Sequence, residues 1–248
     1  MKIVCIIPAR LGSYRFPKKP FVDICGKSMI EHVYKRASLS QKIDEVYVAT
    51  PNDEIRTHVE GFGGKVIMTS DDVRRASDRV AQAAKKIPKA DIIINLQGDE
   101  PLVTPTMIDL ALEPFLKGEK IHCASLAKKV SFDEASDIHE VKVVWDSDRD
   151  ALYFSREAIP SKFMGDKEID YYIGVCVFPF YYDTLMEFTE LETAYLENVE
   201  SIDMMRLIEN KKKVRIIETK EVSYSIDVPE DVPKVIAAME NDLLFGSY

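Results

Sequence analysis

The first half of the chain alternates wholly apolar runs with amphipathic stretches, and this alternation constrains the fold more than any other feature. The run KIVCIIPA (2–9) is rich in β-branched residues and lacks polar alternation, which is typical of a strand buried on both faces. Further strands are predicted at 44–50, at 65–70 and within 90–101. Helices are predicted between them, at 28–40, 52–64, 77–87 and 104–118, with Asn52 and Ser77 as N-caps of the second and third.

Strands that alternate with helices indicate βαβ units, and therefore an α/β fold with a mostly parallel, Rossmann-like sheet flanked by helices. After residue 120 the pattern becomes mixed. Strands are expected at 122–130, 140–146, 151–160, 170–180 and 213–219, and helices at 195–213 and 229–243. Since no linker or repeat interrupts residues 1–248, we expect a single domain with a smaller mixed lobe at about 150–190.

Composition excludes several classes of function. The net charge of −9 argues against nucleic acid as a partner, because binding to a phosphate backbone needs a broad basic surface. No apolar run approaches the length of a membrane span, and the four cysteines show no metal-binding spacing. These features predict a protein of the cytoplasm with no membrane partner.

The loop after the first strand, IIPARLGSYRFPKKP (6–20), is strongly basic. Loops after parallel strands expose backbone N–H groups, and Arg10, Arg15 and Lys19 add donors suited to phosphate. The alternative is a solvated surface run, which is the commoner fate of charge clusters. The loop alone does not decide between a small anionic ligand and this alternative.

Two aspartates follow other apolar runs. Asp99 comes directly after the most hydrophobic strand, in NLQGDEP, and Asp227 follows a short apolar stretch in YSIDVPED. The carboxyl ends of parallel strands meet at one edge of the sheet, so Asp99 is expected close to the basic loop. A carboxylate there suits Mg²⁺ held together with substrate phosphates. The alternative for both residues is a turn or helix-entry aspartate.

These segments together resemble the CMP-Kdo synthetases, the 3-deoxy-manno-octulosonate cytidylyltransferases. The resemblance runs from residue 2 to about 235, and its motifs are IIPARLGSYRFPKKP, GKSMIEHVYKRA, VYVAT, INLQGDEP, VKVVWD, ALYFSREAIP and SIDVPEDV. It implies the nucleotide-diphospho-sugar transferase type of fold. It also implies a Mg²⁺-dependent reaction in which CTP and a sugar acid, Kdo or a related ulosonic acid, give a CMP-sugar acid and pyrophosphate for bacterial surface polysaccharide (lipopolysaccharide) synthesis. A homodimer formed with help from the region 150–190 is implied as well.

The resemblance also implies roles for individual residues. Catalysis is assigned to Arg10, Lys19, Asp99 and Asp227, of which Asp99 and Asp227 bind the metal. The residues assigned to CTP are Ala9, Arg10, Ser13, Arg15, Lys19, Ser77 and Arg79. The residues assigned to the sugar acid are Gln97, Arg156, Tyr172, Glu200 and Met204.

The chain departs from the family pattern in three segments. The usual H-x-S-G-T-D/E-R is VRRASDR (73–79) here, Tyr172 replaces a His, and Met204 replaces a Gln. The departures fall on the base and sugar-acid segments, whereas the phosphate and metal residues are kept. We therefore expect the activation chemistry to be retained and the preference for the acid to have drifted.

Two other functions stay open at this point. A sugar-1-phosphate nucleotidyltransferase shares the fold but opens with a different motif. A catalytically silent nucleotide-binding protein would explain the altered segments, although two retained carboxylates favour an enzyme.

Overall fold

The structure is a computed structural model, and it describes residues 1–12, 15–163, 165 and 168–248. The chain divides into two compact units. Unit 1 comprises Met1–Asp109 and Val222–Tyr248, and unit 2 comprises Leu110–Glu221. Unit 1 is therefore discontinuous in the sequence: the chain leaves it in α4 (Pro105–Leu116) and returns after residue 221.

Unit 1 is built on four parallel strands in the order β5–β4–β1–β6. They are β1 (Ile3–Pro8), β4 (Glu45–Thr50), β5 (Val66–Met68) and β6 (Ile92–Leu96). Three helices pack on strands β1 and β4: α1 (Met29–Ala37), α2 (Asp53–Gly61) and α3 (Ala76–Ala84). Every residue of β1 and β6 is buried, so the prediction from their apolar runs is confirmed.

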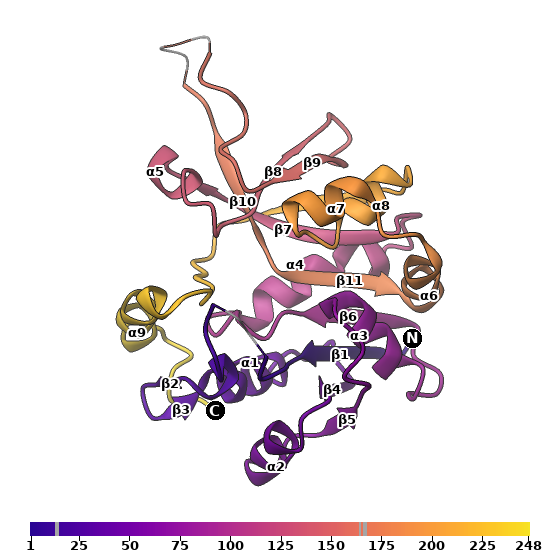
Figure 1. Cartoon of the computed structure of the whole chain (residues 1–248), viewed down its shortest axis with the longest axis vertical. Helices are drawn as coiled ribbons and strands as arrows, with labels where there is room; N and C mark the ends of the chain where they lie inside the picture. Colours follow the sequence, from indigo (N-terminus) through magenta and orange to yellow (C-terminus); the bar gives the residue numbers. More distant parts are fainter. Residues whose placement is uncertain (13–14, 164, 166–167) are drawn as a thin grey trace. The chain divides into compact units, whose positions relative to one another are not determined.

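The segment from Val222 onward completes unit 1. It contains a 3₁₀ turn, Pro229–Asp231, and α9 (Val232–Glu240), which packs on the small hairpin of β2 (Asp23–Ile24) and β3 (Lys27–Ser28) (Figure 1). Ile226 is fully buried in a cluster with Ile24, Met29, Leu102, Val235 and Met239. The backbone that carries Asp227 is thus anchored in the core of unit 1.

Of the two expected N-caps, Asn52 is at its predicted position and Ser77 is not. Asn52 occupies the N-cap position of α2, but its side chain accepts a hydrogen bond from the backbone N–H of Leu11 at 3.0 Å and does not cap the helix. The prediction for Ser77 is wrong, because the N-cap of α3 is Arg75 and Ser77 lies inside the first turn. Ser77 is buried there and accepts a hydrogen bond from Asn95, which explains why a hydroxyl sits at this position.

Unit 2 is mixed, as predicted, and is centred on β7 (Cys123–Val130). Strands β10 (Tyr171–Val175) and β11 (Val177–Tyr181) pair with β7 antiparallel, and β12 (Val214–Thr219) pairs with it parallel. Strand β8 (Lys142–Trp145) pairs with β10 and with β9 (Ala151–Ser155). The helices are α5 (Phe132–Ala135), α6 (Tyr182–Glu190), α7 (Tyr195–Glu200) and α8 (Met205–Glu209).

The single helix expected at 195–213 is wrong, because the structure has two short helices, α7 and α8. Ser201 ends α7 with φ 56°, in the left-handed region. The break lets Arg206 of α8 form two hydrogen bonds with the buried carboxylate of Glu197 in α7, at 2.8 and 2.7 Å. This buried ion pair accounts for the turn at Ser201, which has no glycine to indicate it in the sequence.

The predicted α/β class, with a mostly parallel sheet flanked by helices and a smaller mixed part, is confirmed. Within the described part of the chain, none of the helices has both the length and the apolar character needed to cross a lipid bilayer.

Candidate active site

A pocket of about 370 Å³ opens in unit 1, next to the carboxyl ends of β1 and β6. It brings together most of the residues that the sequence assigned to the nucleotide and the metal. Of those, Ala9, Arg10, Arg15, Lys19, Arg79, Asp99 and Asp227 line it, and Gln97, which was assigned to the sugar acid, lines it too. Ser13 lies outside the described residues.

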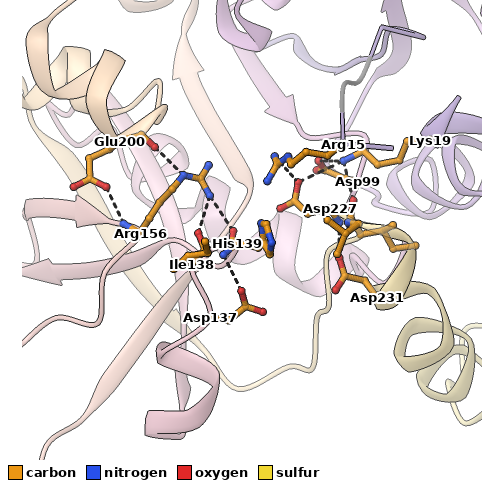
Figure 2. Close-up of polar contacts among 12 residues, drawn as sticks. Arg15, Lys19, Asp99, Asp137, Ile138, His139, Arg156, Glu200, Asp227 and Asp231 are labelled. Carbon is orange, nitrogen blue, oxygen red and sulfur yellow. Dashed lines mark hydrogen bonds and ion pairs between the residues drawn. The ribbon is translucent and has the colours of Figure 1, made fainter. Parts of the chain in front are cut away.

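Lys19 lies at the centre of the acidic side of this pocket (Figure 2). Its ammonium donates to Asp99 Oδ2 at 2.8 Å and to the carbonyl of Ile226 at 2.7 Å, and lies 3.7 Å from Asp227 Oδ1. Burial opposes its charge, but the two carboxylates outweigh burial and raise the pKa of Lys19 above its ordinary value. Lys19 is therefore a permanent cation at neutral pH.

Asp99 and Asp227 are held at this cation by backbone contacts. The N–H of Ile226 donates to the carbonyl of Asp99 at 3.0 Å, which joins the two segments directly. Asp231 then accepts hydrogen bonds from the N–H groups of Asp227 and Val228. Arg15 adds an ion pair with Asp227 Oδ1 at 3.0 Å. The expected proximity of Asp99 to the basic loop is thus observed, and Asp227 lies beside the same loop.

The lining of the pocket is strongly cationic for a protein of net charge −9. Six cationic side chains face two carboxylates. The cations are Arg10, Arg15, Lys19, Arg74, Arg75 and Arg79. A concave surface with this excess positive charge concentrates polyanions, and its arginines offer planar donors that match phosphate oxygens.

The chemistry of the acidic pair fits a hard divalent cation. Asp99 and Asp227 already converge on one cation, the Lys19 ammonium, and both offer only carboxylate oxygens. No group of three or more metal-ligating side chains is present among the described residues. Mg²⁺ suits such a site, because it is commonly held by one or two carboxylates together with substrate phosphates and water.

Gly98 lets the loop after β6 approach β1 closely. A Cβ atom at this position would lie 3.0 Å from the carbonyl oxygen of Pro8 and 3.5 Å from Ile7. Any larger residue would push Gln97 and Asp99 away from the end of β1.

Ser77, Asn95 and Gln97 form a hydrogen-bonded row that reaches the pocket at Gln97. Gln97 donates to the side-chain oxygen of Asn95 at 2.7 Å, and Asn95 donates to Ser77 at 3.1 Å. Asn95 is fully buried, and sequence reasoning missed it. The signal was available, since a lone amide inside the run IIINL must find a partner when buried.

Arg79 is buried, and its guanidinium donates hydrogen bonds to the loop that precedes α3. Its Nη1 donates to Thr69 Oγ1 at 2.6 Å and to the carbonyl of Ser70 at 3.1 Å, and its Nη2 donates to the carbonyl of Val73 at 2.6 Å. Burial and the nearby Arg10 lower the pKa of Arg79. Arg79 therefore fixes residues 69–73 at the edge of the pocket.

In unit 2 the structure brings together two of the residues assigned to the acid, Arg156 and Glu200 (Figure 2). Glu200 Oε2 accepts the backbone N–H of Arg156 at 2.9 Å, and the carbonyl of Glu200 accepts Arg156 Nε at 2.8 Å. Arg156 Nη1 donates to the carbonyls of Ile138 and His139. Glu200 also accepts the hydroxyl of Tyr153 at 3.0 Å, so both side chains are held firmly.

The other two assigned residues of unit 2 lie elsewhere in it. Tyr172 is half-buried on β10 and packs edge-to-face on Trp145, with ring centroids 4.5 Å apart. Burial and the charge of Glu218 raise the pKa of Tyr172, which keeps its hydroxyl protonated. Met204 is buried beside Cys123, whose thiol lies 3.7 Å from its sulfur.

Lys142 was not singled out from the sequence. It is fully buried, and its ammonium donates to the carbonyls of Asp137 and Glu140 and to the carbonyl of Arg156. Burial lowers the pKa of Lys142. By gathering three carbonyls, Lys142 fixes the turn that Arg156 contacts.

Comparison with known proteins agrees with this geometry. Residues 4–215 match the sequence profile of the cytidylyltransferase family. The chain is 39% identical to a 3-deoxy-manno-octulosonate cytidylyltransferase of Geobacter sulfurreducens, over 97% of this chain and 100% of that protein. It is 40% identical to an 8-amino-3,8-dideoxy-manno-octulosonate cytidylyltransferase of a Shewanella species, over 94% of this chain and 97% of that protein.

A solved structure is similar as well. It is a CMP:2-keto-3-deoxy-manno-octonic acid synthetase in complex with CTP, 37% identical, with a TM-score of 0.90 over 98% of this chain and 100% of that one. The resemblance identified from the motifs is therefore confirmed, and the chain belongs to the cytidylyltransferase family.

Proposed function

We propose that the protein joins CTP to a ulosonic acid, giving the CMP-sugar acid and pyrophosphate. The observation that carries the proposal is the pocket of unit 1, where Arg15 and Lys19 are paired with Asp99 and Asp227 among four further arginines. The activities for which the relatives are named support the same reaction.

In this reaction the anomeric hydroxyl of the acid attacks the α-phosphorus, and the bond to the β-phosphate breaks with release of pyrophosphate. The substrate supplies the nucleophile, so the chain only needs to orient the phosphates and neutralise their charge. Arg10, Arg15 and Lys19 do this from the loop after β1. Mg²⁺ held by Asp99 and Asp227 would supply Lewis-acid stabilisation of the phosphoryl oxygens.

We propose 3-deoxy-manno-octulosonate or its 8-amino analogue as the acid, since relatives of both kinds are 39% and 40% identical to the chain. Arg156, Tyr172 and Glu200 are the candidate contacts in unit 2. We further propose a cytoplasmic homodimer whose product serves lipopolysaccharide synthesis.

A pyrophosphate-release assay tests the proposal. Purified protein with CTP and Mg²⁺ is offered the two octulosonates, other sugar acids, and sugar-1-phosphates. Turnover on an octulosonate with CTP, lost on chelation of the metal, is the expected result. Release only with a sugar-1-phosphate would instead identify a sugar-1-phosphate nucleotidyltransferase.

Variants of the carboxylates separate an enzyme from a silent binder. Asp99→Asn and Asp227→Asn should each lower kcat by about 100-fold or more, because each removes charge that balances the metal and phosphates. Asp53→Asn is the matched control, since Asp53 is exposed and pairs only locally with Arg56 at 2.8 Å. Wild-type protein without turnover on any acid would contradict the proposed function.

A further inference from the structure

Arg74 and Arg75 stand in the wall of the unit 1 pocket, together with Arg10, Arg15 and Lys19. They come from the turn between β5 and α3, so they approach the pocket from a different element than the loop after β1. Both lie in the segment VRRASDR, where the chain departs from the pattern H-x-S-G-T-D/E-R of the family it resembles. The pattern leaves the position of Arg74 open and has a Ser at the position of Arg75, so it specifies neither arginine.

The turn that carries Arg74 and Arg75 is fixed by hydrogen bonds with side chains of α3. Arg79, 2% exposed, donates to three oxygens of residues 69–73, the last of which is the carbonyl of Val73, directly before Arg74. The N–H of Ser70 donates to the side-chain oxygen of Gln82 in α3 at 2.7 Å. The backbone that presents Arg74 and Arg75 is therefore ordered before any ligand arrives, which lowers the entropy lost on binding.

The electrostatics of this position favour an anion. Arg75 is the N-cap of α3, a position where the side chain usually accepts a hydrogen bond from the first turn. A guanidinium cannot accept one, and its positive charge lies at the positive end of the helix dipole. Asp78 in the first turn offsets part of this charge. The pocket lining as a whole carries six cationic side chains and two carboxylates, a charge balance that favours an anionic ligand.

The same pocket already holds the other groups suited to phosphate. Ala76, the first residue of α3, also lines it, so the helix N-terminus and the two arginines face one space. Asp99 and Asp227 occupy its acidic side. A polyphosphate in this pocket would thus have cations from two separate elements around it.

We propose that Arg74 and Arg75 bind the phosphate chain of the nucleotide as a second basic arm, in addition to the loop after β1. The inference rests on the proposed function and extends it, because it assigns two nucleotide-binding residues that the family pattern does not contain. The arm contacts phosphates and not the base, so it acts equally on the triphosphate and on the pyrophosphate product.

Direct binding measurements test this without the acid acceptor. Calorimetric titrations with CTP, with pyrophosphate and with cytidine, all with Mg²⁺, are compared for wild-type protein, Arg74→Ala, Arg75→Ala and Arg75→Ser. Each variant should weaken CTP and pyrophosphate by about tenfold, the order expected for a charge-assisted contact, and leave cytidine unchanged. The dependence of log Kd for CTP on log salt concentration should also become shallower.

Arg56→Ala is the matched control, because Arg56 is an exposed arginine of unit 1 outside the pocket lining and pairs with Asp53. Arg75→Lys keeps the charge without the planar fork and should recover part of the affinity. Thermal unfolding of each variant checks that the turn still folds.

Variants that bind CTP and pyrophosphate as tightly as the wild type would overturn the inference. A loss of equal size for cytidine would also overturn it, because it would place the arginines at the base. Wild-type protein that binds none of the three ligands would contradict the proposed function itself and the inference with it.

Discussion

The carboxylate of Asp231 holds the backbone of Asp227, accepting its N–H at 2.7 Å and that of Val228 at 2.9 Å. On the other side of Asp227, the N–H of Ile226 is bonded to Asp99. The direction of the Asp227 side chain is therefore set from both sides, by a residue that need not touch substrate.

Replacing Asp231 should weaken the metal site more than the chemistry. Asp231→Ala leaves two N–H groups without their acceptor, which costs about 0.5–2 kcal/mol of stability, the range for a lost cap. We expect half-maximal activity to require several-fold more Mg²⁺, with kcat at saturating Mg²⁺ within about threefold of the wild type. Asp231→Asn, which keeps an acceptor oxygen, should recover most of the loss. A magnesium titration of turnover measures the Mg²⁺ requirement, and Glu230→Ala is the control because Glu230 is exposed. The same Mg²⁺ requirement in Asp231→Ala as in Glu230→Ala would contradict the prediction.

Tyr248 closes a buried polar network in unit 1. His32 Nε2 lies 2.7 Å from the carbonyl of Ile24, which can only accept, so His32 Nδ1 accepts the Tyr248 hydroxyl at 2.7 Å. Arg36 Nε donates to the same hydroxyl at 2.8 Å. Tyr248→Phe removes the hydroxyl partner of His32 and Arg36, which are both fully buried. It should lower the free energy of unfolding by about 1–3 kcal/mol. Urea denaturation checks this against Tyr195→Phe, since Tyr195 is 75% exposed. Similar losses in the two variants would argue against the network.

The same network predicts a pH dependence of stability. Burial lowers the pKa of His32 below its ordinary 6.5, with Arg36 and Lys27 adding to the effect and the Ile24 carbonyl opposing it. Below about pH 6.5 His32 is therefore protonated in the unfolded chain but still neutral in the folded chain. The free energy of unfolding consequently falls as the pH drops below about 6.5. His32→Gln removes the titration, and its stability deficit relative to the wild type should shrink from pH 7.5 to 5.5. Denaturation curves at several pH values measure the deficit, and a constant value would refute the assignment.

Breaking the buried pair of Glu197 and Arg206 should destabilise unit 2 strongly. Their side chains are 0% and 3% exposed, and the guanidinium makes two hydrogen bonds with the carboxylate. Glu197→Gln leaves a buried cation without its counter-charge, which costs about 3–5 kcal/mol. Glu187→Gln is the control, because Glu187 pairs with Lys212 at the surface and should cost less than about 1 kcal/mol. Thermal denaturation compares them; a small effect of Glu197→Gln would mean that water reaches Arg206.

The sequence predicted the parts of the fold that local patterns determine. The apolar runs of β1 and β6 bury both faces of their strands, so their period and length identify a parallel sheet without further knowledge. Parallel topology then places Lys19 beside Asp99, although 80 positions separate them, because both follow strands of one sheet.

Features decided by contacts between distant residues were not predictable in this way. The break at Ser201 depends on the pairing of Arg206 with Glu197, and residues 195–213 carry no glycine or proline to mark it. Ser77 lies inside α3, where it pairs with Asn95 of strand β6. This pairing joins two elements that are distant in the sequence. The hairpin of β2 and β3 has strands too short for any period to appear.

Because unit 1 is discontinuous, its pocket has a fixed order of assembly during synthesis. A ribosome adds about 5–20 residues per second, and folding begins from the N-terminal side. Arg10, Lys19 and Asp99 are synthesised before any of 110–221, and Asp227 is synthesised after all of it. For all that time the nascent chain carries the basic loop after β1 and only one of the two carboxylates that pair with it. A newly made chain is thus unable to complete this pocket before unit 2 has been synthesised in full.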